Sequence, residues 1–128
     1  MQYMMLVYLD ENALSQAESE SCYRESTQLA QELDASGHYL AAAPLQPTST
    51  ATSVQVRDGK RLVTDGPFAE TREQLGGYFL IEANDLDEAI RIAARIPVAR
   101  RGTIEIRPVI ELAGLPAPSP AGRVVESV

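Results

Sequence analysis

The strongest constraint on the fold comes from two segments that are apolar at both odd and even positions. Residues 2–9 read Gln-Tyr-Met-Met-Leu-Val-Tyr-Leu, and residues 78–82 read Tyr-Phe-Leu-Ile-Glu. Successive side chains of a strand point to opposite faces of the sheet, so each segment predicts a strand with large apolar groups on both faces. The fold must therefore cover both faces of the sheet that holds these strands.

The chain offers two helices for this purpose. Residues 15–18 fit a capping box, and small or apolar residues recur at helical spacing up to Gly37, which predicts a helix over about 16–36. The outer face of this helix carries Glu18, Glu25, Gln28 and Glu32, which predicts a solvated surface. A second capping pattern predicts a helix over about 86–96 that ends before Pro97.

The remaining segments complete an α+β chain. Residues 38–45 and 103–107 predict strands, and Asp58-Gly59 predicts a tight hairpin turn between two short strands. Without the hairpin, the order matches the βαβ-βαβ pattern of a ferredoxin-like sandwich. Two helices cover only one face of its sheet, so the apolar residues of the other face need a second surface. A homodimer with sheet-to-sheet contact supplies one, and dimers are the commonest soluble homo-oligomers.

Composition excludes several classes of function. The 128 residues include 18 acidic and 11 basic ones and carry a formal net charge of −7, which argues against nucleic acid and anionic membranes as partners. No apolar run approaches the roughly 20 residues of a membrane span, and no secretory leader is recognisable. The single Cys22 excludes an internal disulfide and is typical of a cytoplasmic protein. One Cys and one His cannot form a structural zinc site, and no cofactor is expected.

The polar, Gly-rich stretch 64–78 separates the hairpin from the strand at 78–82. Its Asp65 has two interpretations. A carboxylate in a loop bounded by Gly66-Pro67 could act as a base or bind a ligand. Asp before Gly-Pro also often accepts hydrogen bonds from its own turn.

This stretch resembles the motif of the DGPF-domain branch of the YCII-related family. The resemblance rests on residues 63–71, Val-Thr-Asp-Gly-Pro-Phe-Ala-Glu-Thr, and residues 73–78, Glu-Gln-Leu-Gly-Gly-Tyr, and it extends in order from residue 1 to about 112. It implies ferredoxin-like protomers that form a dimeric α/β barrel, and bacterial, cytoplasmic proteins whose genes often accompany extracytoplasmic-function sigma factors. It implies no particular reaction. Residues 113–128 form a Pro/Ala-rich tail outside the resemblance.

The wider family includes members with a proposed catalytic pair, a histidine in the first helix and an aspartate near the end of the second. The corresponding places here fall near Ser26 and Ile96. Neither side chain can perform that acid–base chemistry.

Six residues are candidates for a site. Asp65 and His38 are the candidate catalytic pair, and His38 has the one side chain whose unperturbed pKa is near neutrality, although an exposed position after Gly37 is the alternative. Tyr3, Tyr78, Glu70 and Arg107 are candidate ligand-binding residues at a mouth between sheet and loop, with a solvated edge as the alternative.

Two hypotheses follow for the function. The first is a homodimeric module that binds a small ligand or a regulatory protein, with a sigma factor as the candidate partner. The second is a small enzyme of lyase, isomerase or hydrolase type in which Asp65 and His38 converge across a pocket.

Overall fold

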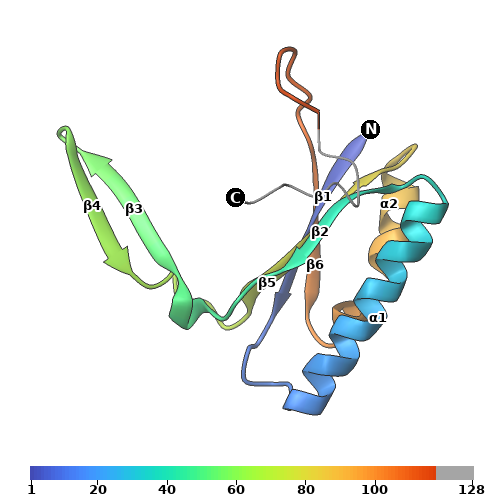
Figure 1. The fold of residues 1–128 in the computed structure, drawn as a ribbon, viewed down its shortest axis with the longest axis horizontal. Coiled ribbons are helices and arrows are strands. Elements are labelled where there is room, and N and C mark those ends of the chain that lie inside the picture. The colour runs from blue at the N-terminus through green and yellow to red at the C-terminus, as the bar shows by residue number, and fades with distance from the viewer. Residues whose placement is uncertain (118–128) are drawn as a thin grey trace, which may run out of the picture.

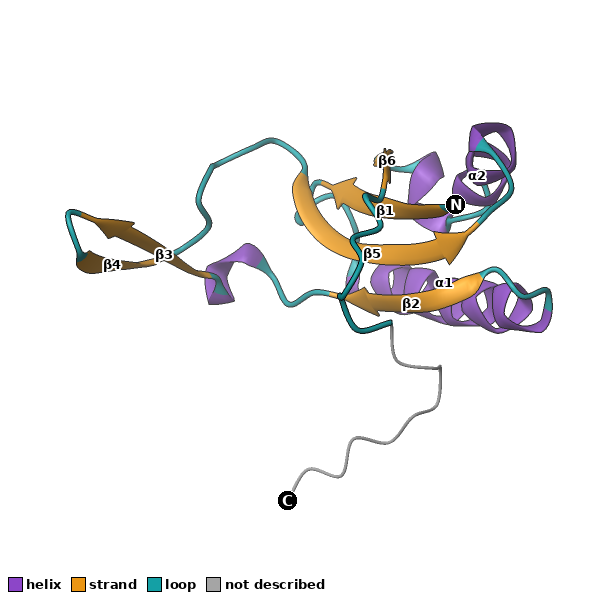
Figure 2. Cartoon of the chain, turned by 90° about the horizontal axis from the view of Figure 1, so that it is seen from above, coloured by secondary structure: helices purple, strands orange, loops and turns teal. Residues whose placement is uncertain are grey.

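The structure, a computed structural model, describes residues 1–117. Two helices pack on one face of a four-stranded antiparallel sheet, and a two-stranded hairpin projects from one end of that sheet (Figures 1 and 2). The elements in chain order are β1 (Gln2–Leu9), α1 (Gln16–Ala35), β2 (Tyr39–Pro44), the 3₁₀ turn η1 (Thr48–Thr50), β3 (Thr52–Arg57), β4 (Lys60–Asp65), β5 (Gln74–Glu82), α2 (Leu86–Ala93), the 3₁₀ turn η2 (Pro97–Arg100) and β6 (Thr103–Pro108).

The strand order β2-β5-β1-β6 confirms the predicted ferredoxin-like α+β fold. Strand β5 starts at Gln74, earlier than predicted, so Gly76 and Gly77 lie inside this strand and the loop before it ends at residue 73. Among the described residues, no helix has the length and apolar character needed to cross a membrane. The predicted tail 113–128 lies mostly outside the described residues.

Local signals set the ends of the helices. The Ser15 hydroxyl accepts from the Glu18 N–H and the Glu18 carboxylate accepts from the Ser15 N–H, which confirms the capping box of α1. Helix α2 ends at Ala93, three residues earlier than predicted. After the C-cap Ala94, Arg95 and Ile96 donate to carbonyls only three positions back, because Pro97 disfavours α-helical backbone in the residue before it.

The two faces of the sheet differ in their cover. On β1, Tyr3, Met5 and Val7 are buried against the helices, together with Leu33 and Ile81. The alternate residues of the two central strands are only half-buried and form what we call the open face: Met4, Leu6, Tyr8, Tyr78 and Leu80. The helices thus cover one of the two apolar faces that the sequence predicts.

The outer face of α1 is exposed to solvent and forms ion pairs. Glu18, Glu25 and Glu32 pair with Arg101, Arg100 and Arg95 at 2.8, 3.2 and 2.8 Å, respectively. The three glutamate side chains remain 44–57% exposed, so the predicted solvated face is present and also carries these ion pairs. The arginines follow α2 in the chain, so the pairs tie α1 to the segment around η2.

The projecting hairpin β3–β4, which we call the arm, begins and ends at the same end of the sheet (Figure 1). Asp58 and Gly59 have φ of 53° and 73°, the positive values of the predicted tight turn. No other strand of the described residues pairs with either strand of the arm.

Candidate functional site

A cavity of about 440 Å³ lies between α1 and the sheet. Helix α1 contributes small and polar groups to its wall, and strand β5 contributes the run Gly76–Phe79. Because four consecutive strand residues touch it, the cavity meets the backbone of β5 as well as its side chains. Much of the remaining wall is apolar and includes Val7, Leu9, Ala30, Ala42, Ile96 and Val98.

Gly77 permits the close approach of β5 to β2 at the cavity wall. A Cβ at this position would lie 2.9 Å from the Ala43 carbonyl oxygen and 3.2 Å from the Pro44 Cα. Both atoms belong to the backbone, so a side chain here would push β2 away from β5. This glycine of the family-like motif therefore has a packing reason that also shapes the cavity.

The polar groups of the cavity carry little charge. In the part of the chain that the structure describes, no Lys, Arg or His side chain is among the lining residues. The one lining carboxylate, Glu11, already accepts the Thr48 N–H at 2.8 Å and the Thr48 hydroxyl at 2.7 Å. The groups left to meet a ligand include hydroxyls of α1, such as Ser19, Tyr23 and Ser26, and the thiol of Cys22.

Ser26 and Ile96 both line this cavity, although they come from α1 and from the end of the second helical region. They are the places where the wider family is expected to carry its histidine and aspartate. The cavity thus lies where such a pair would act, but it holds a hydroxyl and an alkyl group there. A serine without a neighbouring base does not transfer protons efficiently near neutral pH.

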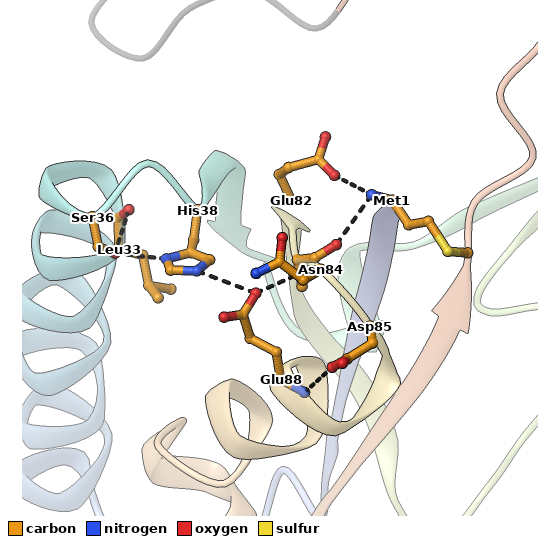
Figure 3. A network of polar contacts seen from close by, with 9 residues as sticks. Met1, Leu33, Ser36, His38, Glu82, Asn84, Asp85 and Glu88 are labelled. Atoms are coloured by element: carbon orange, nitrogen blue, oxygen red, sulfur yellow. Dashed lines mark hydrogen bonds and ion pairs between the residues drawn. The ribbon is translucent and has the colours of Figure 1, made fainter.

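His38 lies outside the cavity, between the end of α1 and the start of α2 (Figure 3). Its Nδ1 is 2.7 Å from the Ser36 hydroxyl, and its Nε2 is 3.4 Å from a carboxylate oxygen of Glu88. The Ser36 hydroxyl donates to the Leu33 carbonyl, so its oxygen is left to accept from Nδ1–H. These contacts tie the two helices together, which gives His38 a structural role.

Glu88 is the centre of this polar network. Its carboxylate accepts from the Asn84 N–H at 2.8 Å, and its own N–H donates to the N-cap residue Asp85. The Asn84 N–H, with a smaller contribution from His38, holds the pKa of Glu88 below its ordinary value.

Asp65 is exposed at the end of β4, at the base of the arm. Neither a hydrogen bond nor an ion pair of its carboxylate occurs among residues 1–117, so the expected capping of its own turn is not found there. The turn is closed by Gly66, whose N–H donates to the Ala51 carbonyl at 2.7 Å and whose φ is 119°. His38 instead contacts Ser36 and Glu88, so one protomer does not bring the candidate catalytic pair together.

The four candidate ligand-binding residues do not form one site. Tyr78 is the only one of them that lines the cavity. Tyr3 is 3% exposed in the core, where its hydroxyl approaches the Met1 sulfur, and Arg107 pairs with Glu105 at 3.4 Å. Glu70 is exposed in the loop before β5. The predicted mouth between sheet and loop was therefore wrong for Tyr3, which is buried in the core.

Sequence patterns alone did not reveal the cavity. Cys22 lies on the stripe of small and apolar residues of α1, where it is half-buried and lines the cavity. The available signal was the presence of Ser26 and Cys22 on a stripe that otherwise faces the core. Within residues 1–117, no group of three or more His, Cys, Asp or Glu side chains could hold a metal ion.

The fold and the cavity define a ferredoxin-like α+β protein with a hollow between its first helix and its sheet. The YCII-related domain matches residues 1–113, and the chain belongs to this family. It is 37% identical over 114 residues to the uncharacterized protein R00369 of Rhizobium meliloti (strain 1021), an alignment that covers 85% of this chain and 92% of the relative.

A similar fold occurs in 5-chloro-2-hydroxyhydroquinone dehydrochlorinase (TftG) from Burkholderia phenoliruptrix AC1100, solved in complex with 2,5-dihydroxybenzoquinone. The TM-score is 0.52, the sequence identity is 12%, and the match covers 86% of this chain and 94% of that protein. At this identity the likeness shows the fold alone.

Proposed function

We propose that this protein binds a small, uncharged and largely apolar molecule in the cavity between α1 and the sheet. The observation that carries the proposal is a cavity of about 440 Å³ that no cationic side chain of residues 1–117 lines, and whose one carboxylate among those residues is already hydrogen-bonded. Cavities of roughly 300–1,000 Å³ with apolar walls and a few polar groups are typical of small-molecule sites.

The chemistry of the wall defines the class of ligand. A carboxylate or phosphate would lose its hydration without gaining a cation, which is strongly unfavourable. A phenol, alcohol or ketone would bury its apolar body and exchange hydrogen bonds with hydroxyls such as Ser26. Ser26 and Ile96 stand where wider-family members are expected to carry the catalytic histidine and aspartate. Because neither can act as an acid or a base there, the cavity is suited to binding without catalysis.

Calorimetric titration with two matched probes tests the proposal. 4-Propylphenol should bind with a dissociation constant of roughly 10 µM to 1 mM, and 4-propylbenzoate, which adds a charge to a similar body, at least about tenfold more weakly. Ser26→Leu, which fills the cavity, should abolish phenol binding. Gln31→Leu, which introduces the same side chain at an exposed position of α1, should leave it unchanged. Equal affinity for the two probes, or full binding to Ser26→Leu, would refute the proposal.

The assembly we propose is a homodimer formed through the open face. The five half-buried residues of this face present apolar surface that neither helix covers, and paired sheets bury such surface in a packed layer. In sedimentation equilibrium, Leu80→Glu should therefore raise the dissociation constant of the dimer at least about tenfold, whereas Ile90→Glu on the exposed side of α2 should not. If Leu80→Glu keeps the wild-type dissociation constant, the open face is not the interface.

We further propose a cytoplasmic location and an extracytoplasmic-function sigma factor as the candidate regulatory partner. The support is the family resemblance in the signature stretch 63–78. A calorimetric titration of the protein against the sigma factor encoded beside its gene tests the partner. The absence of heat and of a complex at micromolar concentrations would count against it.

A small enzyme of lyase, isomerase or hydrolase type is the alternative, and TftG is an enzyme with this fold. Within one chain, the geometry favours the cavity over the Asp65 and His38 pair as the place for such chemistry. Turnover that survives His38→Gln and Asp65→Asn but is lost in Ser26→Leu would support an enzyme that uses the cavity.

A further inference from the structure

The arm presents an apolar face that nothing in the described chain covers. Directly paired residues of a hairpin share a face, so Thr52 and Asp65, Val54 and Val63, and Val56 and Arg61 all lie on the same side. Val54, Val56 and Val63 are 59%, 61% and 57% exposed. The opposite side carries mostly polar groups, such as Ser53, Gln55, Lys60 and Thr64. We call the first side the valine face.

Such an arm requires a partner to stabilise it. A two-stranded hairpin by itself is at best marginally stable in water. At its base, the arm is held by the Gly66 N–H to the Ala51 carbonyl and by the Ser53 hydroxyl to the Gly66 carbonyl, both at 2.7 Å. These contacts orient the arm but leave the valine face exposed.

The charges on the valine face are arranged in a self-complementary way. Asp65 lies at the base, the valines in the middle and Arg61 near the tip. Four residues of a strand separate Arg61 from Asp65, or roughly 13 Å. If two such faces stack in opposite directions around a two-fold axis, each Arg61 meets the Asp65 of the other copy, and the valines pack between the two pairs.

We propose that the valine face of the arm docks on the valine face of a second copy of this chain, with two Arg61–Asp65 ion pairs at its ends. A two-fold interface requires a surface that complements itself, and the order of acid, valines and base meets this requirement. Stacked sheets lie about 10 Å apart, a gap that an Arg and an Asp side chain span together. Asp65 of the signature stretch then serves assembly.

This contact is independent of the open face and of the ligand cavity, because it uses none of their residues. The assay is therefore run in the Leu80→Glu background, where the open-face contact is removed. Failure of the arm contact then leaves the phenol titration and the open-face test unaffected.

Cysteine cross-linking between copies tests the contact. In Cys22→Ser protein, Val63→Cys places a thiol at the middle of the valine face, near the expected two-fold axis. Thr64→Cys places an exposed thiol on the opposite side of the same strand and is the matched control. Under oxidising conditions at low salt, Val63→Cys should form covalent dimers at least about tenfold faster than the control.

Charge reversal then tests the ion pairs. Arg61→Asp should slow cross-linking of Val63→Cys several-fold, and adding Asp65→Arg should restore the rate because the exchanged charges again attract. Lys60→Asp makes the same charge change on the opposite face and should have little effect. Equal rates for Val63→Cys and Thr64→Cys would overturn the proposal, and so would a charge exchange that fails to restore the rate.

Discussion

Gly102 lies where the chain turns into β6 beside β1, and its replacement by alanine is a sharp test of the sheet geometry. A Cβ on Gly102 would lie 2.1 Å from the Tyr8 carbonyl oxygen and 3.1 Å from the Leu9 Cα. Carbon–oxygen contacts are normally about 3.3 Å or longer, so the backbones must separate by roughly 1.2 Å. Such a shift must disturb the neighbouring pairing of Tyr8 with Thr103.

The expected loss of stability follows from this displacement. Overpacking typically costs about 1–3 kcal/mol. The atoms that the new Cβ meets belong to the backbone and cannot rotate away, so we expect Gly102→Ala at the upper end of that range. The lower entropy of the unfolded alanine chain offsets about 0.4–1 kcal/mol. We therefore expect the free energy of unfolding to fall by about 2 kcal/mol, which corresponds to a decrease in Tm of roughly 8 °C.

Gly76→Ala is the matched control. Its Cβ would lie 2.6 Å from the Leu9 Cδ2, the end of a flexible side chain that can rotate away, so the expected loss is below about 1 kcal/mol. Urea unfolding followed by circular dichroism, at one fixed protein concentration, measures both variants. The reasoning fails if Gly102→Ala stays within about 0.5 kcal/mol of the wild type, or if Gly76→Ala is equally destabilised.

Two further predictions concern α1. The Ser15 N–H and then Arg101 lower the pKa of Glu18 to about 2 from an ordinary 4.5, so the stabilisation is present above about pH 4.5 and is lost as the pH falls towards 2. Glu18→Gln should therefore lower the unfolding free energy more at pH 7 than at pH 3 in urea titrations, and Glu20→Gln should show no such difference. Because Cys22 lines the cavity, saturating 4-propylphenol should slow its alkylation by iodoacetamide several-fold, as followed by mass spectrometry. An unchanged rate would place the phenol elsewhere.

The signature stretch shows how far sequence patterns reach. Its resemblance to the YCII-related family is confirmed by the match over residues 1–113. A separate pattern, Asp58-Gly59, located the tight turn of the hairpin that leads to Asp65. The Gly-rich composition of residues 64–78 placed Gly77 in a loop, whereas this residue lies in β5, where the close approach of β2 leaves no room for a side chain.

Local sequence patterns were sufficient to predict the elements whose causes are local. The capping box of α1 joins residues three positions apart, and the arm's turn depends on positive φ at two adjacent residues. Apolar residues at both odd and even positions of two strands also predicted correctly that the sheet has two apolar faces. Tertiary structure decided the contacts between distant segments: His38 with Glu88, Glu32 with Arg95, and the cavity that Ser26 and Ile96 share. Those contacts depend on how helices and strands pack in space, which the spacing of residues along one element does not specify.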